Sequence, residues 1–272
     1  MATESDLRSL HDVLLRANRE HPDSEAFIYR AAGEEHVVTY RKFYEDVLLL
    51  SRAFAEKKIG KGSKVLFLSD NRYAWIVTDF ALISLGAISV PRGSDSPTRE
   101  LEYIIDHSEC DYLIVETLSL LDNHSEMFSR KKLRNVFVIE GEKEHKLFSN
   151  LYSYNDLMKD RSITPEDIRA FEALGDDLEQ EDIFTLIYTS GTTGNPKGVI
   201  LNHRNVMYNV EKIPLVVDLS RDDYWLSVLP TWHIFERAAE YMAISSGGCT
   251  VYSSVKTFAE DLQYYKPTLV CS

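Results

Sequence analysis

The chain has few cysteines and no excess of basic residues, and we expect no signal peptide. Among its 272 residues only Cys110, Cys249 and Cys271 are cysteines, and none lies in a CxxC pair. This scarcity argues against a disulfide framework and against a cysteine-based zinc site. Residues 1–20 carry charges throughout and lack the apolar core of a secretory signal. We therefore expect a protein of a reducing compartment, the cytoplasm.

A long apolar run is also missing. The most apolar stretch, residues 75–90, is interrupted by Asp79 and is too short to span a bilayer. The formal net charge of −13 argues against non-specific binding of nucleic acid and does not favour docking to anionic lipid. A local, peripheral contact at the inner face of a membrane stays open, and so does a homodimer.

What is present is an alternation of strand-like and helix-like segments. With 44% hydrophobic residues, the chain can bury a sizeable core. The alternation predicts an α/β fold with stacked, mostly parallel sheets covered by helices. We expect Ser96 to be an N-cap. The expected strands are 64–69, 87–91, 112–116, 135–139, 183–188, 198–202, 224–230 and 248–253, and the main helices are 72–85, 98–107, 118–131, 203–213, 234–245 and 256–265.

An acidic stretch interrupts this alternation. Residues 155–182 hold ten acidic and three basic side chains. We interpret residues 156–182 as a solvated connector between a first α/β lobe, residues 1–155, and a second lobe, residues 183–272. A regulatory or partner-binding segment is the alternative. The last residues, PTLVCS, read as a strand that has just begun, so we expect the chain to be part of a longer protein.

Residues 188–199, YTSGTTGNPKGV, have the composition of a phosphate-binding loop between two apolar strands. Its glycines allow backbone N–H groups to approach a polyphosphate, and its hydroxyls and its lysine can bind phosphate oxygens or a magnesium ion. It is not a Walker A loop, because Pro196 stands where that spacing requires glycine. The candidate ATP-binding residues are Thr189, Ser190, Gly191, Thr192, Thr193, Gly194, Lys197 and Gly198.

The stretch TSGTTGNPKG resembles the phosphate loop of the adenylate-forming (AMP-binding) enzymes, which include acyl-CoA synthetases. A second stretch, LPTWHIFER at 229–237, is similar to the form of the next family motif in long-chain fatty acyl-CoA synthetases. A third and weaker match is LISLGAISVPRGSDSP at 82–97. The resemblance covers nearly the whole chain and implies part of the large N-terminal domain of such an enzyme.

The resemblance also implies a reaction. A complete enzyme of this type activates a fatty acid with ATP and Mg²⁺ as an acyl adenylate, releases pyrophosphate and passes the acyl group to coenzyme A. Thr189 matches the magnesium-binding threonine, Lys197 and His233 match catalytic residues, and His233 also matches a residue of the adenylate site. Trp232 and His233 match positions that line the acyl pocket.

Three readings stay open at this point. The first is a long-chain fatty acid–CoA ligase, a lipid-metabolism enzyme, of which this chain alone is expected to be inactive because further family motifs are absent from it. The second keeps the chemistry but uses an acyl carrier protein as acceptor. The third is a module that binds a nucleotide or an acyl group without turnover. We interpret Glu236 and Arg237 as a structural ion pair and not as catalytic groups.

Replacing Lys197 with alanine tests the phosphate-loop interpretation. We expect Lys197→Ala to weaken ATP binding by roughly 1.5–3 kcal/mol, the scale of a charge-assisted hydrogen bond. Titration of ATP, followed by calorimetry, measures this change. An unchanged affinity would discard the phosphate-binding role of Lys197.

Overall fold

The larger of two β-sheets forms one side of the molecule. A computed structural model describes residues 7–142, 144–189 and 195–271. Within these ranges the larger sheet has seven strands in the order β7-β6-β5-β3-β4-β8-β9, all parallel except the edge strand β9. The strands are β3 (Lys64–Leu68), β4 (Ile88–Arg92), β5 (Tyr112–Thr117), β6 (Asn135–Glu140), β7 (Leu151–Ser153), β8 (Ile183–Thr189) and β9 (Lys197–Asn202).

The smaller sheet joins both ends of the described chain. Its order is β12-β10-β11-β1-β2, and β2 is its antiparallel edge. β1 pairs with its hairpin partner β2 on one side and with the distant β11 on the other, where Phe27 lies opposite Thr250. The strands are β1 (Glu25–Ala31), β2 (Glu34–Thr39), β10 (Tyr224–Ser227), β11 (Cys249–Tyr252) and β12 (Leu269–Val270).

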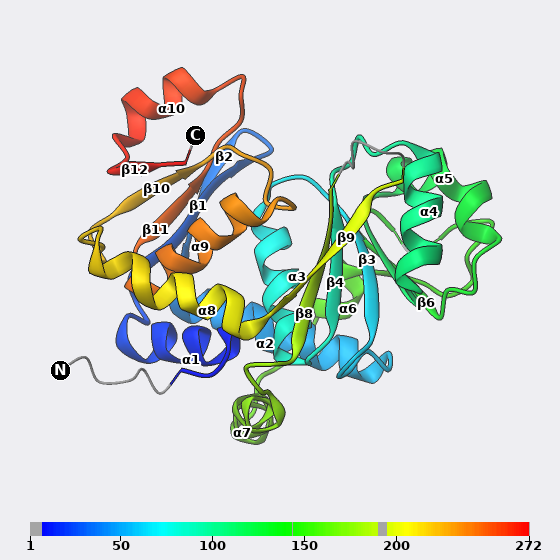
Figure 1. Ribbon diagram of the computed structural model, residues 1–272, viewed down its shortest axis with the longest axis horizontal. Helices are drawn as coiled ribbons and strands as arrows, with labels where there is room; N and C mark the ends of the chain where they lie inside the picture. Colours follow the sequence, from blue (N-terminus) through cyan, green and yellow to red (C-terminus); the bar gives the residue numbers. More distant parts are fainter. Residues whose placement is uncertain (1–6, 143, 190–194, 272) are drawn as a thin grey trace.

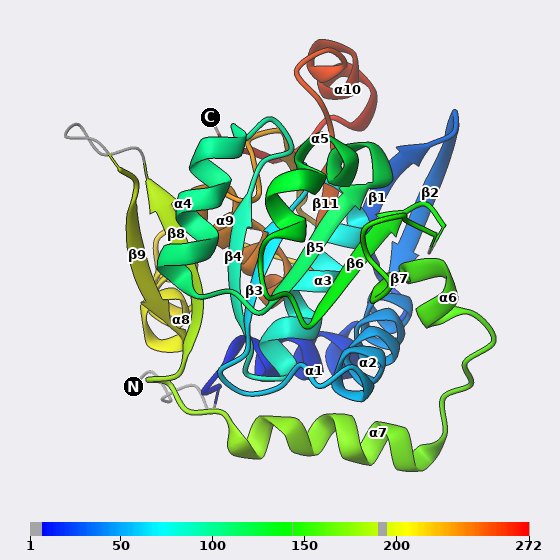
Figure 2. The same ribbon diagram turned by 90° about the vertical axis from the view of Figure 1, so that its right-hand side faces the viewer.

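Helices separate and cover the two sheets (Figure 1). α3 and α9 lie between the sheets, α10 covers the outer side of the smaller sheet, and α4 and α5 cover the outer face of the larger one (Figure 2). None of the helices in the described ranges combines the length and apolar composition needed to cross a bilayer. The helices are α1 (Leu10–Glu20), α2 (Tyr40–Glu56), α3 (Tyr73–Ser84), α4 (Thr98–Ser108), α5 (Leu118–Ser129), α6 (Tyr154–Met158), α7 (Pro165–Glu172), α8 (His203–Lys212), α9 (Ile234–Ser246) and α10 (Phe258–Tyr265), with 3₁₀ turns at Ala173–Asp177 and Ile213–Leu215.

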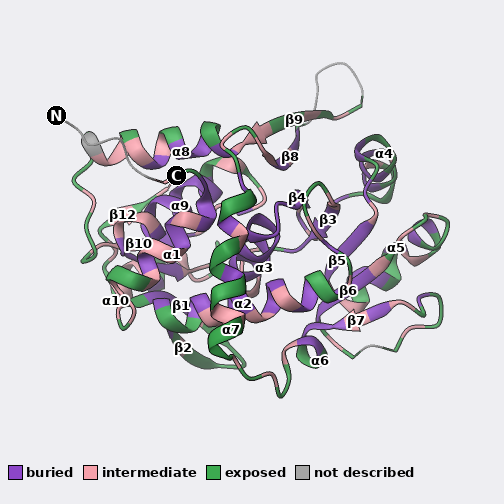
Figure 3. Ribbon diagram, turned by 90° about the horizontal axis from the view of Figure 1, so that it is seen from below, coloured by how far each residue is buried: buried purple, intermediate pink, exposed green. Residues whose placement is uncertain are grey.

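Strand alternation divides the core between these layers. In β3, Val65 and Phe67 point to the inter-sheet core, whereas Leu66 and Leu68 join the core under α4 and α5. Each strand of a sheet covered on both faces must be apolar on both sides, which explains the uninterrupted apolar run of β3. Figure 3 shows the resulting burial of α3 and α9 in the middle layer.

The structure confirms the α/β class and the mostly parallel sheets, and it corrects two local expectations. Ser96 is not an N-cap, because α4 begins at Thr98 with Pro97 in the cap position, and the Ser96 hydroxyl donates instead to the Gly93 carbonyl at 2.8 Å. The strand expected over 224–230 ends at Ser227. The division into lobes at 156–182 stays a prediction, and both sheets take strands from either side of that stretch.

A buried arginine joins the middle layer to the larger sheet. Arg237 on α9 is fully buried and ion-paired with the equally buried Asp79 on α3. Its Nη1 donates to Thr185 Oγ1 on β8 at 2.8 Å, and its Nη2 donates to Ser89 Oγ on β4 at 3.0 Å. The Tyr241 hydroxyl donates to Asp79 Oδ2 at 2.5 Å. These bonds fix α9 relative to α3, β4 and β8 in one cluster.

Removing the carboxylate from this cluster leaves Arg237 buried without its counter-charge. We expect Asp79→Ala to lower the free energy of unfolding by about 3–5 kcal/mol, the cost of breaking a buried pair from one side. Urea unfolding followed by circular dichroism measures the loss. The exposed pair of Glu126 and Arg130 at the C-terminal end of α5 provides the control, since Glu126→Ala should change stability by less than about 1 kcal/mol. Equal losses in the two variants would contradict the structural role of the buried pair.

Candidate functional site

The candidate phosphate loop connects the two strands of an antiparallel pair. β8 leads into it and β9 leads out of it, and Thr189 lies opposite Lys197 in the register of the two strands. Both side chains are exposed at the end of the hairpin. Ser190, Gly191, Thr192, Thr193 and Gly194 lie outside the described residues. The hydroxyl of Thr189 and the ammonium group of Lys197 can both bind phosphate oxygens. The Thr189 hydroxyl is also a possible ligand for a magnesium ion.

Gly198 lets the hairpin pack closely on a buried tyrosine. A Cβ at this position would lie 3.1 Å from Cζ of Tyr188. The Tyr188 hydroxyl is 2.7 Å from Nδ1 of His107 on α4. Burial raises the pKa of Tyr188 to about 12, so this hydroxyl stays protonated at neutral pH. Gly198 and Tyr188 thus seat the start of β9, next to Lys197, against the α4 side of the sheet.

A cavity lies beside the described end of the loop. It has a volume of about 660 Å³, which is within the usual range of ligand pockets. Helix α4 supplies one wall, and the residues just before Lys197 supply the other. Its lining residues are Pro97, Arg99, Glu100, Glu102, Tyr103, Asn195 and Pro196.

The second motif lies in the turn between β10 and α9. His233 is the N-cap of α9, and its Nδ1 accepts a hydrogen bond from the Phe235 N–H at 3.4 Å. The side chain is exposed. This places the imidazole at the N-terminus of a 13-residue helix, where the helix dipole favours negatively charged groups. The turn therefore presents His233 beside an end of α9 that can stabilise an anionic ligand.

Arg92 connects Trp232 to the strand that enters the phosphate loop. Its guanidinium lies 5.2 Å from the centre of the Trp232 ring, and its Nη1 donates to the Tyr188 carbonyl at 3.0 Å. Nη2 is ion-paired with Glu100 of α4. The Trp232 ring also packs closely on Gly93, where a Cβ would lie 2.7 Å from Nε1. The two motifs are thus joined through a residue of the third, weaker motif.

Arg92 was not among the residues predicted from the sequence, although it lies in the third motif, residues 82–97. Its role depends on a partner 140 positions away, Trp232, and on Tyr188, 96 positions away. Glu236 and Arg237 were expected to form an ion pair, but the acidic partner of Arg237 is Asp79. A buried basic residue requires an acidic partner nearby. In the sequence, the one indication of this ion pair was Asp79, an isolated acidic residue within an apolar helix.

Two carboxyl groups lie buried on one face of α9. Glu236 and Glu240 are one helical turn apart and each is 2% exposed. Burial raises the pKa of Glu236 to about 7. Burial, and secondarily the charge of Glu236, raise the pKa of Glu240 well above its ordinary value. The Glu240 carboxyl accepts hydrogen bonds from Ser227 at 3.0 Å and from Tyr252 at 3.1 Å, which partly offset the effect of burial on its pKa.

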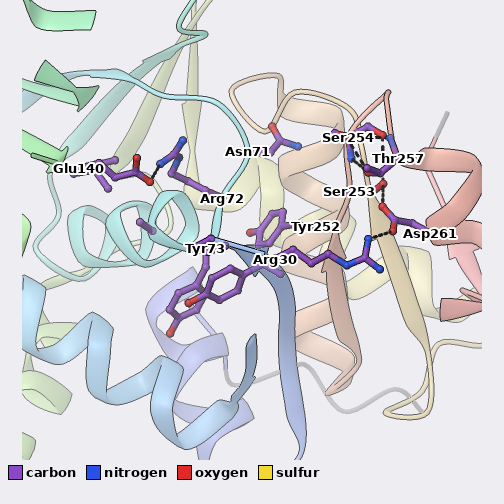
Figure 4. A pocket seen from close by; sticks show the side chains of 15 residues that line it. Arg30, Asn71, Arg72, Tyr73, Glu140, Tyr252, Ser253, Ser254, Thr257 and Asp261 are labelled. Atoms are coloured by element: carbon purple, nitrogen blue, oxygen red, sulfur yellow. Dashed lines mark hydrogen bonds and ion pairs between the residues drawn. The ribbon is translucent and has the colours of Figure 1, made fainter. Parts of the chain in front are cut away.

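A second cavity opens where strands of both sheets end (Figure 4). It has a volume of about 670 Å³ and lies outside the carboxyl ends of β1, β3, β6 and β11. Arg30 is ion-paired with Asp261 at 2.7 Å on one side, and Arg72 is ion-paired with Glu140 on the other. None of the candidate residues from the sequence lines this cavity, whereas Asn71, in the loop between β3 and α3, does.

Comparisons with known proteins agree with the fold and the motifs. The family model described as AMP-binding enzyme matches residues 14–272. The chain is 28% identical over 279 residues to the chloroplastic long-chain-fatty-acid–[acyl-carrier-protein] ligase AEE15 of Arabidopsis thaliana, covering 98% of this chain and 38% of that protein. It is 30% identical over 272 residues to the long-chain-fatty-acid–CoA ligase FadD15 of Mycobacterium tuberculosis, covering 96% and 42%.

A solved structure shows the same fold. The long-chain-fatty-acid–CoA ligase FadD1 of Archaeoglobus fulgidus superposes with a TM-score of 0.81 at 25% identity, covering 97% of this chain and 51% of that one. The chain thus spans about two fifths of the length of the two relatives named above and about half of the superposed structure.

The raised pKa of Glu236 predicts a pH dependence of stability. Because Glu236 is more easily protonated in the folded than in the unfolded chain, its contribution is complete below about pH 4.5 and is lost as pH rises through about 7. We expect Glu236→Gln to remove up to roughly 1.4 kcal/mol per pH unit of this loss. Urea unfolding of both proteins at several pH values between 4.5 and 8 measures it.

The exposed Glu34 provides the matched control. Glu34→Gln should leave the pH profile of the wild-type protein unchanged. If the difference in unfolding free energy between wild type and Glu236→Gln is the same at every pH, the interpretation of the buried carboxyl is wrong.

Proposed function

Because the chain belongs to the AMP-binding enzyme family, we propose that it is part of an ATP-dependent acid–thiol ligase for long-chain fatty acids. The enzyme joins the fatty acid to AMP, releases pyrophosphate and transfers the acyl group to coenzyme A. The observation that carries this proposal is the position of Arg92, which contacts both the carbonyl of Tyr188 and the ring of Trp232. A nucleotide at the loop and an acyl group at the turn would therefore be neighbours.

We assign the polyphosphate of ATP to the hairpin turn. Lys197 and Thr189 face each other across the hairpin, so an ammonium and a hydroxyl group are available to the same phosphate. Ser190, Gly191, Thr192, Thr193 and Gly194 complete the proposed cradle. Magnesium supplies charge neutralisation for the phosphates when bound, and Thr189 is its proposed ligand. Lys197 then stabilises the negative charge that builds up on the departing pyrophosphate.

We assign the carboxyl end of the fatty acid to the turn before α9. His233 is exposed at the N-terminus of this helix, where an anionic carboxylate or adenylate is stabilised by the helix dipole. Trp232 is partly buried beside Arg92 and offers an apolar ring to an alkyl chain. The relatives named for long-chain fatty acids support the choice of substrate.

The acceptor has a second candidate. The Arabidopsis relative is named as an acyl-carrier-protein ligase, and it matches 98% of this chain. The mycobacterial relative is named as a CoA ligase and matches 96%. We propose coenzyme A as the first acceptor to test and an acyl carrier protein as the second, because adenylation by the proposed site is common to both.

ATP–pyrophosphate exchange tests the proposed adenylation. The assay is run on this chain and on the full-length protein, each with Mg²⁺ and fatty acids of increasing length. We expect exchange by the full-length protein, strongest with long-chain acids, and none by the 272-residue chain alone. Adding coenzyme A or an acyl carrier protein then identifies the acceptor by the acyl thioester that accumulates.

The controls separate a failed fold from a failed function. Lys197→Ala in the full-length protein should reduce exchange. Its circular dichroism spectrum should stay the same as that of the wild type, which shows that the variant is folded. If folded, full-length protein binds ATP but shows no exchange with any acid tested, the ligase proposal is wrong and the non-catalytic binding module is favoured.

A further inference from the structure

The turn that carries Trp232 and His233 receives little support from its own sheet. β10 ends at Ser227, and α9 begins at Ile234. Between them, the His233 N–H donates to the Pro230 carbonyl at 2.9 Å, which closes the turn on itself. A turn held only by such local bonds can shift relative to the rest of the site. Its position therefore depends on contacts with other parts of the molecule.

Trp232 packs on Arg92 and Gly93, and one side chain in the loop after β3 supplies the hydrogen bonds to the backbone of the turn. Asn71 lies in the loop between β3 and α3, and its Oδ1 accepts hydrogen bonds from the backbone N–H of Thr231 at 2.8 Å and from the Thr231 hydroxyl at 3.1 Å. Its Nδ2 donates to the Leu229 carbonyl at 2.5 Å and to Ser227 Oγ at 3.4 Å. The hydrogen-bonding capacity of the amide is thus fully used on the end of β10 and the turn that follows it.

The geometry around Asn71 favours a rigid connection. Thr231 is completely buried, so the bonds between it and Asn71 are shielded from competing water. Figure 4 shows Asn71 at the edge of the 670 Å³ cavity, between Arg72 on one side and Ser254 and Thr257 on the other. Asn71 thus joins a loop of one sheet to a turn of the other, one residue before Trp232.

We propose that Asn71 is a positioning residue for the acyl-activating site. Its amide holds the backbone of residues 229–231, and this holds Trp232 against Arg92 and His233 at the start of α9. The inference rests on the proposed function, because positioning matters for a reaction only if the turn binds the reacting group. A displacement of about 1 Å at such a site can cost on the order of 100-fold in rate.

Asn71→Ala in the full-length protein tests the proposal. We expect kcat/KM for the fatty acid in ATP–pyrophosphate exchange to fall roughly 10- to 100-fold, with KM for ATP changed less than about twofold. Asn71→Asp keeps the side-chain size and an acceptor for Thr231, but it places a carboxylate oxygen against the Leu229 carbonyl. This variant should show the same selective loss even if Asn71→Ala folds poorly.

Asn150 offers a matched control. Its Nδ2 also holds backbone carbonyls of a distant segment, those of Leu133 at 3.1 Å and Arg134 at 2.9 Å, but far from the turn in sequence. Asn150→Ala removes a comparable amide bridge and should leave both kinetic constants within about twofold of wild type. If Asn71→Ala and Asn150→Ala have the same kinetic constants in an active enzyme, Asn71 is only structural and the proposal is overturned.

A spectroscopic readout decides the matter even if the wild-type protein has no ligase activity. The full-length protein is labelled with fluorotryptophan, and the fluorine signal of Trp232 is identified as the one that a Trp232→Phe variant lacks; Trp75 and Trp225 are the other tryptophans of residues 1–272. Asn71→Ala should shift or broaden the Trp232 signal, and Asn150→Ala should not. If the wild-type protein shows no exchange but Asn71→Ala displaces the Trp232 signal, only the proposed function is contradicted. An unchanged Trp232 signal contradicts the positioning role whatever the activity.

Discussion

The architecture depends on a charge that the protein buries between its two sheets. Arg237 cannot be placed in an apolar layer unless Asp79, Tyr241, Thr185 and Ser89 surround it, and these residues come from two helices and two strands. The hydrogen bonds of the Arg237 guanidinium therefore fix the relative positions of α9, α3 and the larger sheet. The same helix has His233 as its N-cap, so the buried cluster around Arg237 lies one helical turn from the candidate site and fixes its position.

The regular elements were predictable because they depend on local periodicity. The apolar run of β3 and the spacing of α4 are properties of neighbouring residues, and the structure has both elements where they were expected. The phosphate loop and the Trp232–His233 turn were recognisable because their residue types and order are unusual. These patterns do not predict how far apart two motifs lie in space. The structure was needed to show that the two motifs lie on either side of Arg92.

The missed residues share one physical property, which is that their partners are remote in sequence. Asn71 and Thr231 are 160 positions apart, and Asp79 and Arg237 are 158 apart. A polar residue of this kind looks like an ordinary loop or helix residue until its partner is known. The expected strand at 224–230 was too long for the same reason. Leu229 and Thr231 bond to Asn71 instead of to a neighbouring strand.

The pairing of β1 with β11 has a consequence for how this protein is made. Thr250, the parallel partner of Phe27, is synthesised more than two hundred residues after it. Translation of the residues between them takes on the order of 10 s or longer. During that interval β1 has only β2 beside it, and its other backbone edge is open to any extended chain nearby. The smaller sheet can close only after β11 has been synthesised, so a nascent chain that stalls before β11 keeps this strand edge open to pairing with other chains.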